Sequence, residues 1–459
     1  MTSVSTEHVS PKTLRKVIVA AAIGNFVEWF DFAVYGFLAT TIAQQFFPSG
    51  DASAALLKTF AVFAVAFAFR PLGGVFFGML GDRIGRKRTL AMTILLMAGA
   101  TTLIGILPTY AAIGVMAPLL LTLIRCAQGF SAGGEYAGAC AYLMEHAPND
   151  KRAWYGSFVP VSTFTAFAAA AVVAYALEAS LTAEAMASWG WRLPFLIAAP
   201  LGLVGLYLRW QLDETPAFQA VKQEHAVAHS PLKETLRHHG AAICCLGAFV
   251  SLTALSFYMF TTYFATYLQV AGGLSRASAL LVSLIALLFA AALCPFAGLY
   301  SDRVGRRATV VTACVLLIVA VYPSFLLASS GGFAASVVGV MLLAIGAVLC
   351  GVVTAALLSE TFPTRTRYTA SAITYNMAYT LFGGTAPLMA TWLISITDSN
   401  LSPAFYLIAV ALLALAGGLA LPETSRISLH DIPSTEHGSP LPVAAAAGPE
   451  AAADTDEAC

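Results

Sequence analysis

The chain has 459 residues, of which 59% are hydrophobic and only 10% are charged, and its formal net charge at pH 7 is zero. Because a soluble globular protein carries about 25% charged residues, most of this chain is expected to meet lipid rather than water. The balanced charge gives no basis for a nucleic-acid partner, and we predict none.

Twelve apolar stretches follow one another along the chain, and each is long enough to cross a hydrocarbon core of ~30 Å as a helix. They cover residues 17–47, 54–80, 89–108, 111–134, 154–178, 191–210, 240–268, 277–300, 308–329, 332–358, 368–396 and 401–421. Helices satisfy every backbone group in lipid, so we predict an all-α membrane protein with twelve transmembrane helices. The predicted parts are an N-terminal segment (1–16), a six-helix bundle (17–210), a charged connector (211–239), a second six-helix bundle (240–421) and a disordered Pro/Ala-rich tail (422–459).

The basic residues are distributed unevenly between the two sets of alternating loops. Nineteen of the 24 lysines and arginines lie in the N-terminal segment, the connector, the tail and the loops on their side. Only Lys58 and Arg276 lie in loops on the other side. Since cytoplasmic loops carry the excess of Lys and Arg, both termini are predicted to be cytoplasmic.

The first apolar stretch carries two acids and a tyrosine on one face. Glu28, Asp31 and Tyr35 lie within about 60° of one another at ~100° per residue, so this face is expected to point into the bundle. A charge inside the bilayer costs ~2.5–3.5 kcal/mol on insertion scales and therefore indicates function. We predict Asp31 or Glu28 as the proton-coupling group, with Tyr35 as a substrate contact. The alternative is a structural ion pair between helices.

Two arginines lie inside the second and fourth stretches. Arg125, Gln128 and Glu135 fall within about 80° on one stripe of the fourth. Because an arginine fork matches a carboxylate, Arg125 and Gln128 are predicted to bind an anionic or zwitterionic solute, with Arg70 in the second stretch as a further candidate. Glu135 is an additional candidate for proton coupling. The open alternative for Arg125 is a salt bridge to an acid of the first stretch.

Three short patterns recur in the same order in both halves of the chain. Gly78-x-x-x-Asp82-Arg83-x-Gly85-Arg86 returns as Gly298-x-x-x-Asp302-Arg303-x-Gly305-Arg306. Glu145-x-x-Pro148-x-x-x-Arg152 returns as Glu360-x-x-Pro363-x-x-x-Arg367, and Leu212-x-Glu214-Thr215 returns as Leu421-x-Glu423-Thr424. Because every copy lies at the predicted cytoplasmic end of a helix, the patterns indicate a duplicated six-helix unit.

The acids and cations of the first repeated pattern are predicted to form a gate, whose ion pairs close the cytoplasmic side when the carrier faces outward. The candidates are Asp82, Arg83, Arg86, Asp302, Arg303 and Arg306. A plain positive-inside anchor is the alternative, although it does not account for the accompanying aspartates and glycines.

Aromatic residues give the second half a different kind of candidate. Tyr258, Tyr375 and Tyr379 lie in the seventh and eleventh stretches, and the last two are one helical turn apart. An aromatic wall there would attract a quaternary ammonium by cation–π contact, while packing or an interfacial belt is the alternative.

The sequence shows no pattern of a metal, cofactor or catalytic site. The eight cysteines form no CxxC pair or Cys/His cluster, the eight histidines show no ligand spacing, and no GxxxxGK[ST] loop for ATP occurs. We therefore predict no metal, no cofactor beyond the proton as coupling ion, and no enzyme activity.

These motifs resemble the major facilitator superfamily and, within it, the metabolite:H+ symporter family. The resemblance spans about residues 15–425 and rests on the repeated Gly/Asp/Arg loops, on Gly24-Asn25-Phe26-Val27-Glu28-Trp29-Phe30-Asp31-Phe32, on Arg70-Pro71-Leu72-Gly73-Gly74 and on Trp189-Gly190-Trp191-Arg192-Leu193-Pro194-Phe195. The sequence looks closest to the proline/betaine transporter branch and is also similar to α-ketoglutarate and citrate permeases. The resemblance implies the major facilitator fold, two six-helix repeats that rock around a site near the bilayer midplane, and a bacterial inner membrane.

The residues and the resemblance together predict a secondary active transporter that imports a small carboxylate-bearing solute by proton symport. A zwitterion of the proline or glycine betaine type is favoured, and a di- or tricarboxylate such as α-ketoglutarate or citrate stays open. An uncoupled facilitator or a transporter-derived sensor is the alternative from another class. The expected partners are the solute, H+ and the lipid bilayer, and the chain is expected to function as a monomer.

Overall fold

The protein is described here as a computed structural model. It describes residues 11–48, 51–84, 86–134, 136, 139–140, 143–144, 147–210, 235, 237, 239–362 and 367–425. Within these residues every regular element is a helix, in agreement with the predicted all-α class. Most of the predicted connector and nearly all of the predicted tail lie outside the described residues.

The helices of the N-terminal half are α1 (Pro11–Phe37), α2 (Ala39–Phe46), α3 (Ala52–Ala68), α4 (Arg70–Ile84), α5 (Arg86–Ile106), α6 (Tyr110–Ile113), α7 (Met116–Ala132), η1 (Asn149–Lys151), α9 (Arg152–Gly156), α10 (Phe158–Ser180), α11 (Ala183–Ser188), η2 (Gly190–Arg192) and α12 (Leu193–Trp210). Those of the C-terminal half are α15 (Gly240–Tyr258), η3 (Met259–Tyr263), α16 (Phe264–Val270), α17 (Arg276–Val304), α18 (Arg306–Ala328), α19 (Phe333–Glu360), α20 (Arg367–Ala378), η4 (Tyr379–Gly383), α21 (Ala386–Thr397) and α22 (Ser402–Leu419).

The described helices account for each predicted membrane stretch. Nine of them, searched within the described residues, are long and apolar enough to cross a membrane. A further span is the pair α1 and α2, which is bent by 64° at Leu38. Two shorter apolar helices, Ala91–Ile106 and Met116–Ala132, fill the third and fourth stretches.

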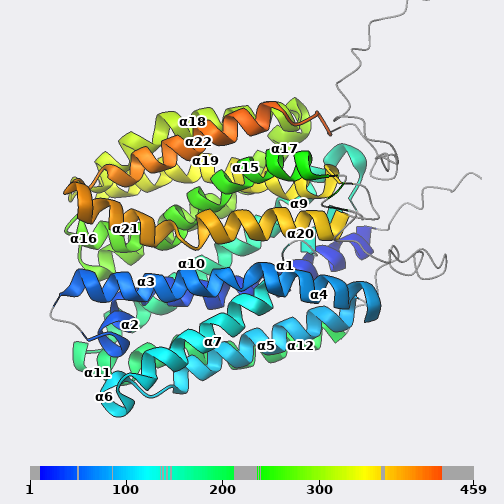
Figure 1. Cartoon of the computed structure of the whole chain (residues 1–459). Helices are drawn as coiled ribbons and strands as arrows, with labels where there is room; N and C mark the ends of the chain where they lie inside the picture. Colours follow the sequence, from blue (N-terminus) through cyan, green and yellow to red (C-terminus); the bar gives the residue numbers. More distant parts are fainter. Residues whose placement is uncertain are drawn as a thin grey trace, which may run out of the picture.

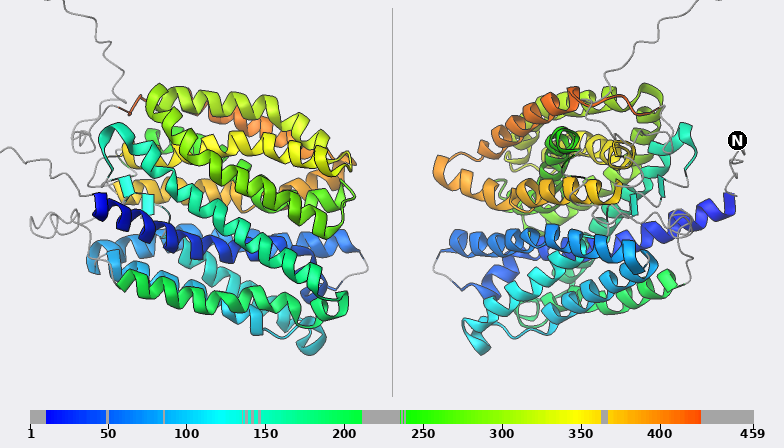
Figure 2. Two further views of the ribbon diagram at one scale, coloured as in Figure 1. Left: turned by 180° about the vertical axis from the view of Figure 1, so that it is seen from behind. Right: turned by 45° about the vertical axis from the view of Figure 1, so that its right-hand side comes forward.

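The two halves lie side by side with their helices roughly parallel (Figure 1). Helix α1 begins and helix α22 ends at the same end of the molecule, on the right of Figure 1, which we call the terminal end. The other end is called the opposite end. Helix α10 of the first half packs along α17 of the second, and α4 packs on α20, so these pairs form the seam between the halves (Figure 2).

Several helix irregularities lie at this seam. Pro71 has no N–H to donate to the Phe67 carbonyl four residues back, and that oxygen accepts the Thr380 hydroxyl at 2.7 Å from the other half. Thr380 belongs to η4, a π-helical turn, and a second π-helical turn, η3, interrupts the seventh span. Such turns are frequent at functional sites, so they indicate a functional site at the middle of the seam.

Candidate functional site

The polar face of α1 is buried at the centre of the molecule, as the sequence predicted. Glu28, Asp31 and Tyr35 are 2%, 1% and 0% exposed. Tyr35 donates its hydroxyl hydrogen to the Thr59 carbonyl at 3.0 Å, which fixes the ring beside α3.

A chain of polar side chains joins Asp31 to Arg125. The Thr101 hydroxyl donates to Asp31 Oδ2 at 2.9 Å, and the Gln128 amide donates to the Thr101 oxygen. Arg125 Nη1 donates in turn to Gln128 Oε1 at 2.8 Å. The other Asp31 oxygen, Oδ1, has no hydrogen-bond partner among the described residues. This orphaned oxygen is where a proton would remove a buried negative charge.

Arg125 is fully buried yet poorly satisfied. Its Nε and Nη2 have no hydrogen-bond partner within the described part of the chain. Its guanidinium lies 4.1 Å from the Tyr35 ring centroid and 5.3 Å from those of Phe32 and Phe63. A buried cation whose donors are unused is costly, unless a ligand completes it. The fork is therefore positioned to receive a carboxylate.

Arg70, and not Arg125, is the cation that Glu28 meets. Arg70 Nη2 lies 3.7 Å from Glu28 Oε1, and both side chains are buried. No ion pair within 4.0 Å joins Arg125 to Glu28 or Asp31 in the described residues, so the alternative of a direct salt bridge for Arg125 does not describe this structure. Arg70 thus has an acid within 4.0 Å, whereas Arg125 reaches Asp31 only through Gln128 and Thr101.

The predicted aromatic wall exists and crosses the seam. Tyr375 stacks on Tyr136 of the first half at 4.4 Å between ring centroids and on Tyr379 at 3.9 Å. Tyr258 meets Tyr379 edge-on at 6.1 Å. The wall is not vacant, because the Arg70 guanidinium lies 6.0 Å from the Tyr375 ring and 5.8 Å from that of Tyr379.

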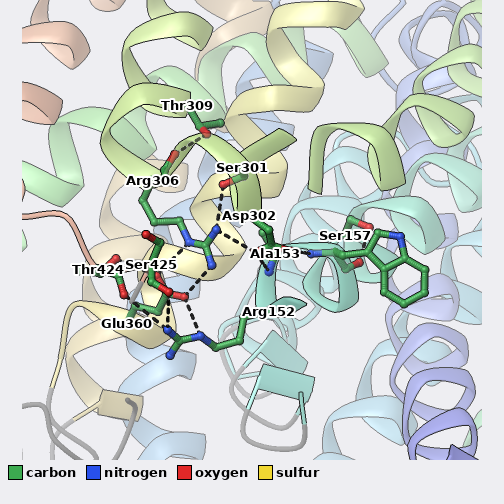
Figure 3. Close-up of polar contacts among 12 residues, drawn as sticks. Arg152, Ala153, Ser157, Ser301, Asp302, Arg306, Thr309, Glu360, Thr424 and Ser425 are labelled. Atoms are coloured by element: carbon green, nitrogen blue, oxygen red, sulfur yellow. Dashed lines mark hydrogen bonds and ion pairs between the residues drawn. The ribbon is translucent and has the colours of Figure 1, made fainter. Parts of the chain in front are cut away.

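A second charged cluster lies at the terminal end (Figure 3). Arg306 donates to both Glu360 oxygens at 3.0 Å and to Asp302 at 3.0 Å. Arg152 of the first half lies 3.2 Å from Glu360, and all three of Arg152, Arg306 and Glu360 are buried. Glu360 therefore binds one arginine from each half. We call Arg152, Asp302, Arg306 and Glu360 the terminal-end cluster.

Backbone contacts tie the same cluster across the seam. Asp302 accepts hydrogen bonds from the backbone N–H groups of Ala153 at 3.0 Å and Trp154 at 2.9 Å. Gly298 makes this approach feasible, because a Cβ there would lie 2.7 Å from the Ala153 carbonyl oxygen. The first glycine of the repeated pattern is thus required by close packing between the halves.

Glu423 caps the start of α18 next to the cluster. Its carboxylate accepts from the backbone N–H groups of Arg306 at 2.8 Å and Arg307 at 3.0 Å. Burial alone would raise the pKa of Glu423, but hydrogen bonds from the N–H groups of Arg306, Ser425 and Arg307 outweigh it and hold that pKa below its usual value. Gly305, with φ of 95°, leaves room for this carboxylate, since a Cβ there would lie 2.7 Å from it.

The opposite end is held more loosely. Arg276 at the start of α17 lies 3.5 Å from Glu178 of α10 and donates to the Thr41 hydroxyl, and both charged side chains are partly exposed. A cavity of about 660 Å³ lies at this end of the seam. It is lined from both halves, among others by Gln44, Phe47, Tyr263, Tyr267 and Thr391.

Comparison with known proteins decides the family. The Major Facilitator Superfamily model matches residues 21–387. The chain belongs to the major facilitator superfamily. Two relatives cover 90% of this chain and 84% of their own length: the proline/betaine transporter of Salmonella typhimurium, at 38% identity over 423 residues, and the glycine betaine/proline/ectoine/pipecolic acid transporter OusA of Dickeya dadantii, at 40%. The ectoine/proline transporter ProP of Corynebacterium glutamicum is 38% identical and covers 91% of the chain and 86% of its own length.

Solved structures show the same fold. The proton:xylose symporter XylE bound to 6-bromo-6-deoxy-D-glucose matches with a TM-score of 0.74 at 18% identity, covering 92% of this chain and 98% of its own. The inward open XylE matches with a TM-score of 0.65 at 19% identity, covering 91% and 98%. The predicted twelve-helix architecture of two repeats is thereby confirmed, and this facilitator is a multi-pass membrane transporter and not an enzyme.

Some predicted gate residues of this facilitator enter the terminal-end cluster and others do not. Asp302 and Arg306 lie within it, whereas Arg303 is exposed and makes no hydrogen bond or ion pair within the described residues. The structure does not describe the side chains of Asp82, Arg83 and Arg86, and it does not describe Glu135 at all.

The sequence reasoning missed three residues of the terminal end. Arg152, Glu360 and Glu423 were each part of a repeated pattern, yet none was proposed as a gate residue. The recurrence of an acid and an arginine at helix ends was the signal that could have found them.

Proposed function

We propose that this transporter imports a small zwitterion of the proline or glycine betaine type together with a proton. The observation that carries the proposal is the incomplete polar chain at the centre. It begins at Arg125, two of whose nitrogens have no hydrogen-bond partner among the described residues and can bind an anion, and it ends at Asp31, whose Oδ1 likewise has none and can bind a proton.

The geometry suggests how the two ligands are coupled. A substrate carboxylate binds Nε and Nη2 of Arg125 and cancels part of the positive field that favours ionised Asp31. Asp31 then takes a proton on Oδ1, while Thr101 and Gln128 keep both groups in place. Proton and solute are thus loaded together, as symport requires.

Charge balance favours a single carboxylate on the substrate. Glu28 lies 3.7 Å from Arg70, whereas Arg125 has no acid within 4.0 Å among the described residues. A di- or tricarboxylate would bring a second charge without a free cation to receive it, which makes it the weaker candidate. The names of the relatives, which include proline, betaine and ectoine, support the same choice.

The terminal-end cluster is proposed as the gate on that side. Arg152 and Asp302 belong to different halves and make contacts across the seam, so the cluster must separate before this end can open. At the opposite end the Arg276–Glu178 pair is partly exposed, and in the described residues no further ion pair joins it. The structure accordingly corresponds to a carrier closed most firmly at its terminal end.

We also propose that the terminal end faces the cytoplasm of a bacterial inner membrane and that one chain is sufficient for transport. The excess of basic residues on this side supports the orientation, and the central site is built from a single chain. A green fluorescent protein fused after Cys459 should fluoresce in cells. A periplasmic phosphatase that is active at that position would contradict the orientation, and a dimer as the smallest active particle would contradict the monomer.

The deciding experiment is uptake into proteoliposomes that contain the purified protein, with and without an imposed inward proton gradient. Labelled proline, glycine betaine, α-ketoglutarate, citrate and shikimate form the panel. Gradient-dependent accumulation of proline or glycine betaine is expected. Accumulation of a di- or tricarboxylate instead would replace the substrate class. Equal uptake without a gradient would show a facilitator without proton coupling.

A further inference from the structure

Arg70 sits inside a box of aromatic rings. Its guanidinium carbon lies 5.8 Å from the Trp29 ring centroid, 5.6 Å from Phe32 and 5.1 Å from Phe67, all in the first half. Tyr375 and Tyr379 of the second half add rings at 6.0 and 5.8 Å. Each distance is within the ~6 Å over which a ring face attracts a cation. We call these five residues the aromatic box.

The box is built like a receptor for an organic cation, yet it holds a cation of the protein. The hydrogen bonds of Arg70 in the box are incomplete. Its Nε and Nη1 have no hydrogen-bond partner among the described residues, and its hydrogen bond to the Ala132 carbonyl is long, at 3.5 Å. Aromatic faces recognise weakly hydrated cations, of which the quaternary ammonium is the best example. Guanidinium is also weakly hydrated and is therefore a fair substitute for one.

We propose that Arg70 occupies, in the empty carrier, the aromatic box that receives the ammonium of the substrate, and that substrate binding displaces Arg70 toward Glu28. The proposal rests on the zwitterionic substrate proposed above and adds the residues that select its cationic end. Glu28 is the acid that a displaced Arg70 would keep as its partner, because Arg70 Nη2 already lies 3.7 Å from it.

The box lies beside the proposed carboxylate site. The ring of Phe32 is within 6 Å of both guanidinium groups, at 5.6 Å from that of Arg70 and 5.3 Å from that of Arg125. The two sites thus share Phe32, and the proposal places the carboxylate of a zwitterion at Arg125 and its ammonium in the box. Because rings from both halves form the box, a bound ammonium would also hold the halves together, which links recognition to closure.

The competing explanation is that Arg70 is a structural cation whose only role is to pair with Glu28. The two explanations differ in what an empty box does. If the rings form a site for the substrate, removing Arg70 leaves a vacant receptor for any small quaternary ammonium. If Arg70 is structural, its removal leaves only a packing defect beside a buried acid.

Tetramethylammonium distinguishes the two explanations because it has no carboxylate and needs no transport cycle. Equilibrium binding of labelled tetramethylammonium is measured on the purified wild type and on Arg70→Gln. The double variant Glu28→Gln/Arg70→Gln removes both buried charges, so that neither is left unpaired. Both variants are expected to bind about tenfold more tightly than the wild type.

Two variants serve as controls for this gain. Arg70→Lys keeps a cation in the box and should show no gain. Arg192→Gln removes an arginine that lies 4.5 Å from one ring, that of Trp191, far along the chain from the box, and it should also leave affinity unchanged. A measurement on the wild type covers the case in which the variants do not fold: saturating tetramethylammonium should shift the guanidinium resonance of Arg70 and not that of Arg192.

The outcomes separate this inference from the proposed function. If folded Arg70→Gln and the double variant bind tetramethylammonium no better than the wild type, the inference is wrong even where proline or betaine uptake is found. The same holds if the variants do not fold and the wild-type resonance does not move. If affinity rises while the wild type transports neither proline nor betaine, the box is a cation site and the proposed substrate is wrong.

Discussion

The molecule holds two buried clusters of acids and arginines, one at the centre and one at the terminal end, and they differ in how completely their hydrogen bonds are made. In the terminal-end cluster Arg306 donates to Glu360, Asp302 and the Ser301 hydroxyl, and Glu360 also faces Arg152. At the centre Arg125 makes a single side-chain hydrogen bond, and two of its nitrogens are unpaired among the described residues.

This difference separates a contact that closes from a site that receives. Buried ions are stable only when they are paired and hydrogen-bonded, so the terminal-end cluster, in which every guanidinium nitrogen of Arg306 donates a hydrogen bond, holds one arrangement of the two halves until it is broken. An unsaturated cluster is stabilised by whatever completes it, which at Arg125 is an anion and at Asp31 a proton. The closed terminal end and the incomplete centre are therefore consistent with the solute-free state of a carrier.

The strongest test of the centre is Arg125→Gln. Losing one side of a buried carboxylate–arginine contact costs ~2–5 kcal/mol, so solute uptake should fall by about 30-fold or more. Arg125→Lys keeps the positive charge but not the guanidinium fork, so it should retain only part of the wild-type uptake rate. Initial rates in proteoliposomes measure this, and Arg192→Gln serves as the matched control. Unchanged uptake in Arg125→Gln would remove Arg125 from the substrate site.

Asp31→Asn should separate transport from coupling. The amide retains a hydrogen-bond acceptor for Thr101 but cannot take up a proton, so solute exchange across the membrane should continue. Accumulation driven by a proton gradient should be lost. Counterflow and gradient-driven uptake of the same solute, measured in one preparation, give the comparison. Gradient-driven accumulation at the wild-type level would assign coupling to another acid, with Glu28 next in line.

Breaking the terminal-end cluster should loosen one end without touching the centre. Glu360→Gln removes the buried carboxylate that Arg152 and Arg306 share, a change that costs ~3–5 kcal/mol in similar pairs. The backbone amides of Ala153 and Trp154, now bonded to Asp302, should then exchange hydrogen faster by mass spectrometry. The backbone amide of Thr380, whose hydroxyl contacts Phe67 across the seam, provides the internal control for exchange. Unchanged protection of Ala153 and Trp154 would mean that the cluster does not hold the halves together.

The membrane helices and the polar face of α1 could be predicted from sequence, because both depend on local periodicity. Twenty apolar residues fix a span wherever they occur, and the spacing of Glu28, Asp31 and Tyr35 fixes their common face. The structure buries all three, as expected.

The pairing of charges could not be predicted, because it depends on how distant helices dock. Glu28 meets Arg70 and not Arg125, a choice set by the packing of α4 against its neighbours. Thr101 links the polar chain but sits in an apolar stretch without a distinguishing pattern. The occupation of the tyrosine wall by Arg70 likewise depends on contacts between the two halves.

The smallest expected effect concerns Glu423, at the exposed edge of the terminal-end cluster. Its pKa is lowered in the folded chain, so the stability it contributes is present above the unfolded pKa of ~4.3 and is lost as pH falls through the lower folded value. Because the side chain is largely exposed, the contribution should stay below about 1 kcal/mol. Glu423→Gln should therefore lower the thermal unfolding temperature slightly at pH 7 and weaken its decline below pH ~4.3.

Glu184→Gln is the matched control for that measurement, since Glu184 is an exposed acid that accepts none of these backbone hydrogen bonds. If both variants decline with pH as the wild type does, Glu423 is not linked to folding, and the start of α18 is held by the Arg306–Glu360 contact alone. A change confined to Glu423→Gln would instead show that the last repeated pattern of the sequence stabilises the closed terminal end. The complete hydrogen bonding around Arg306 would then extend to the solvent-facing rim of the cluster, in contrast to the incomplete centre.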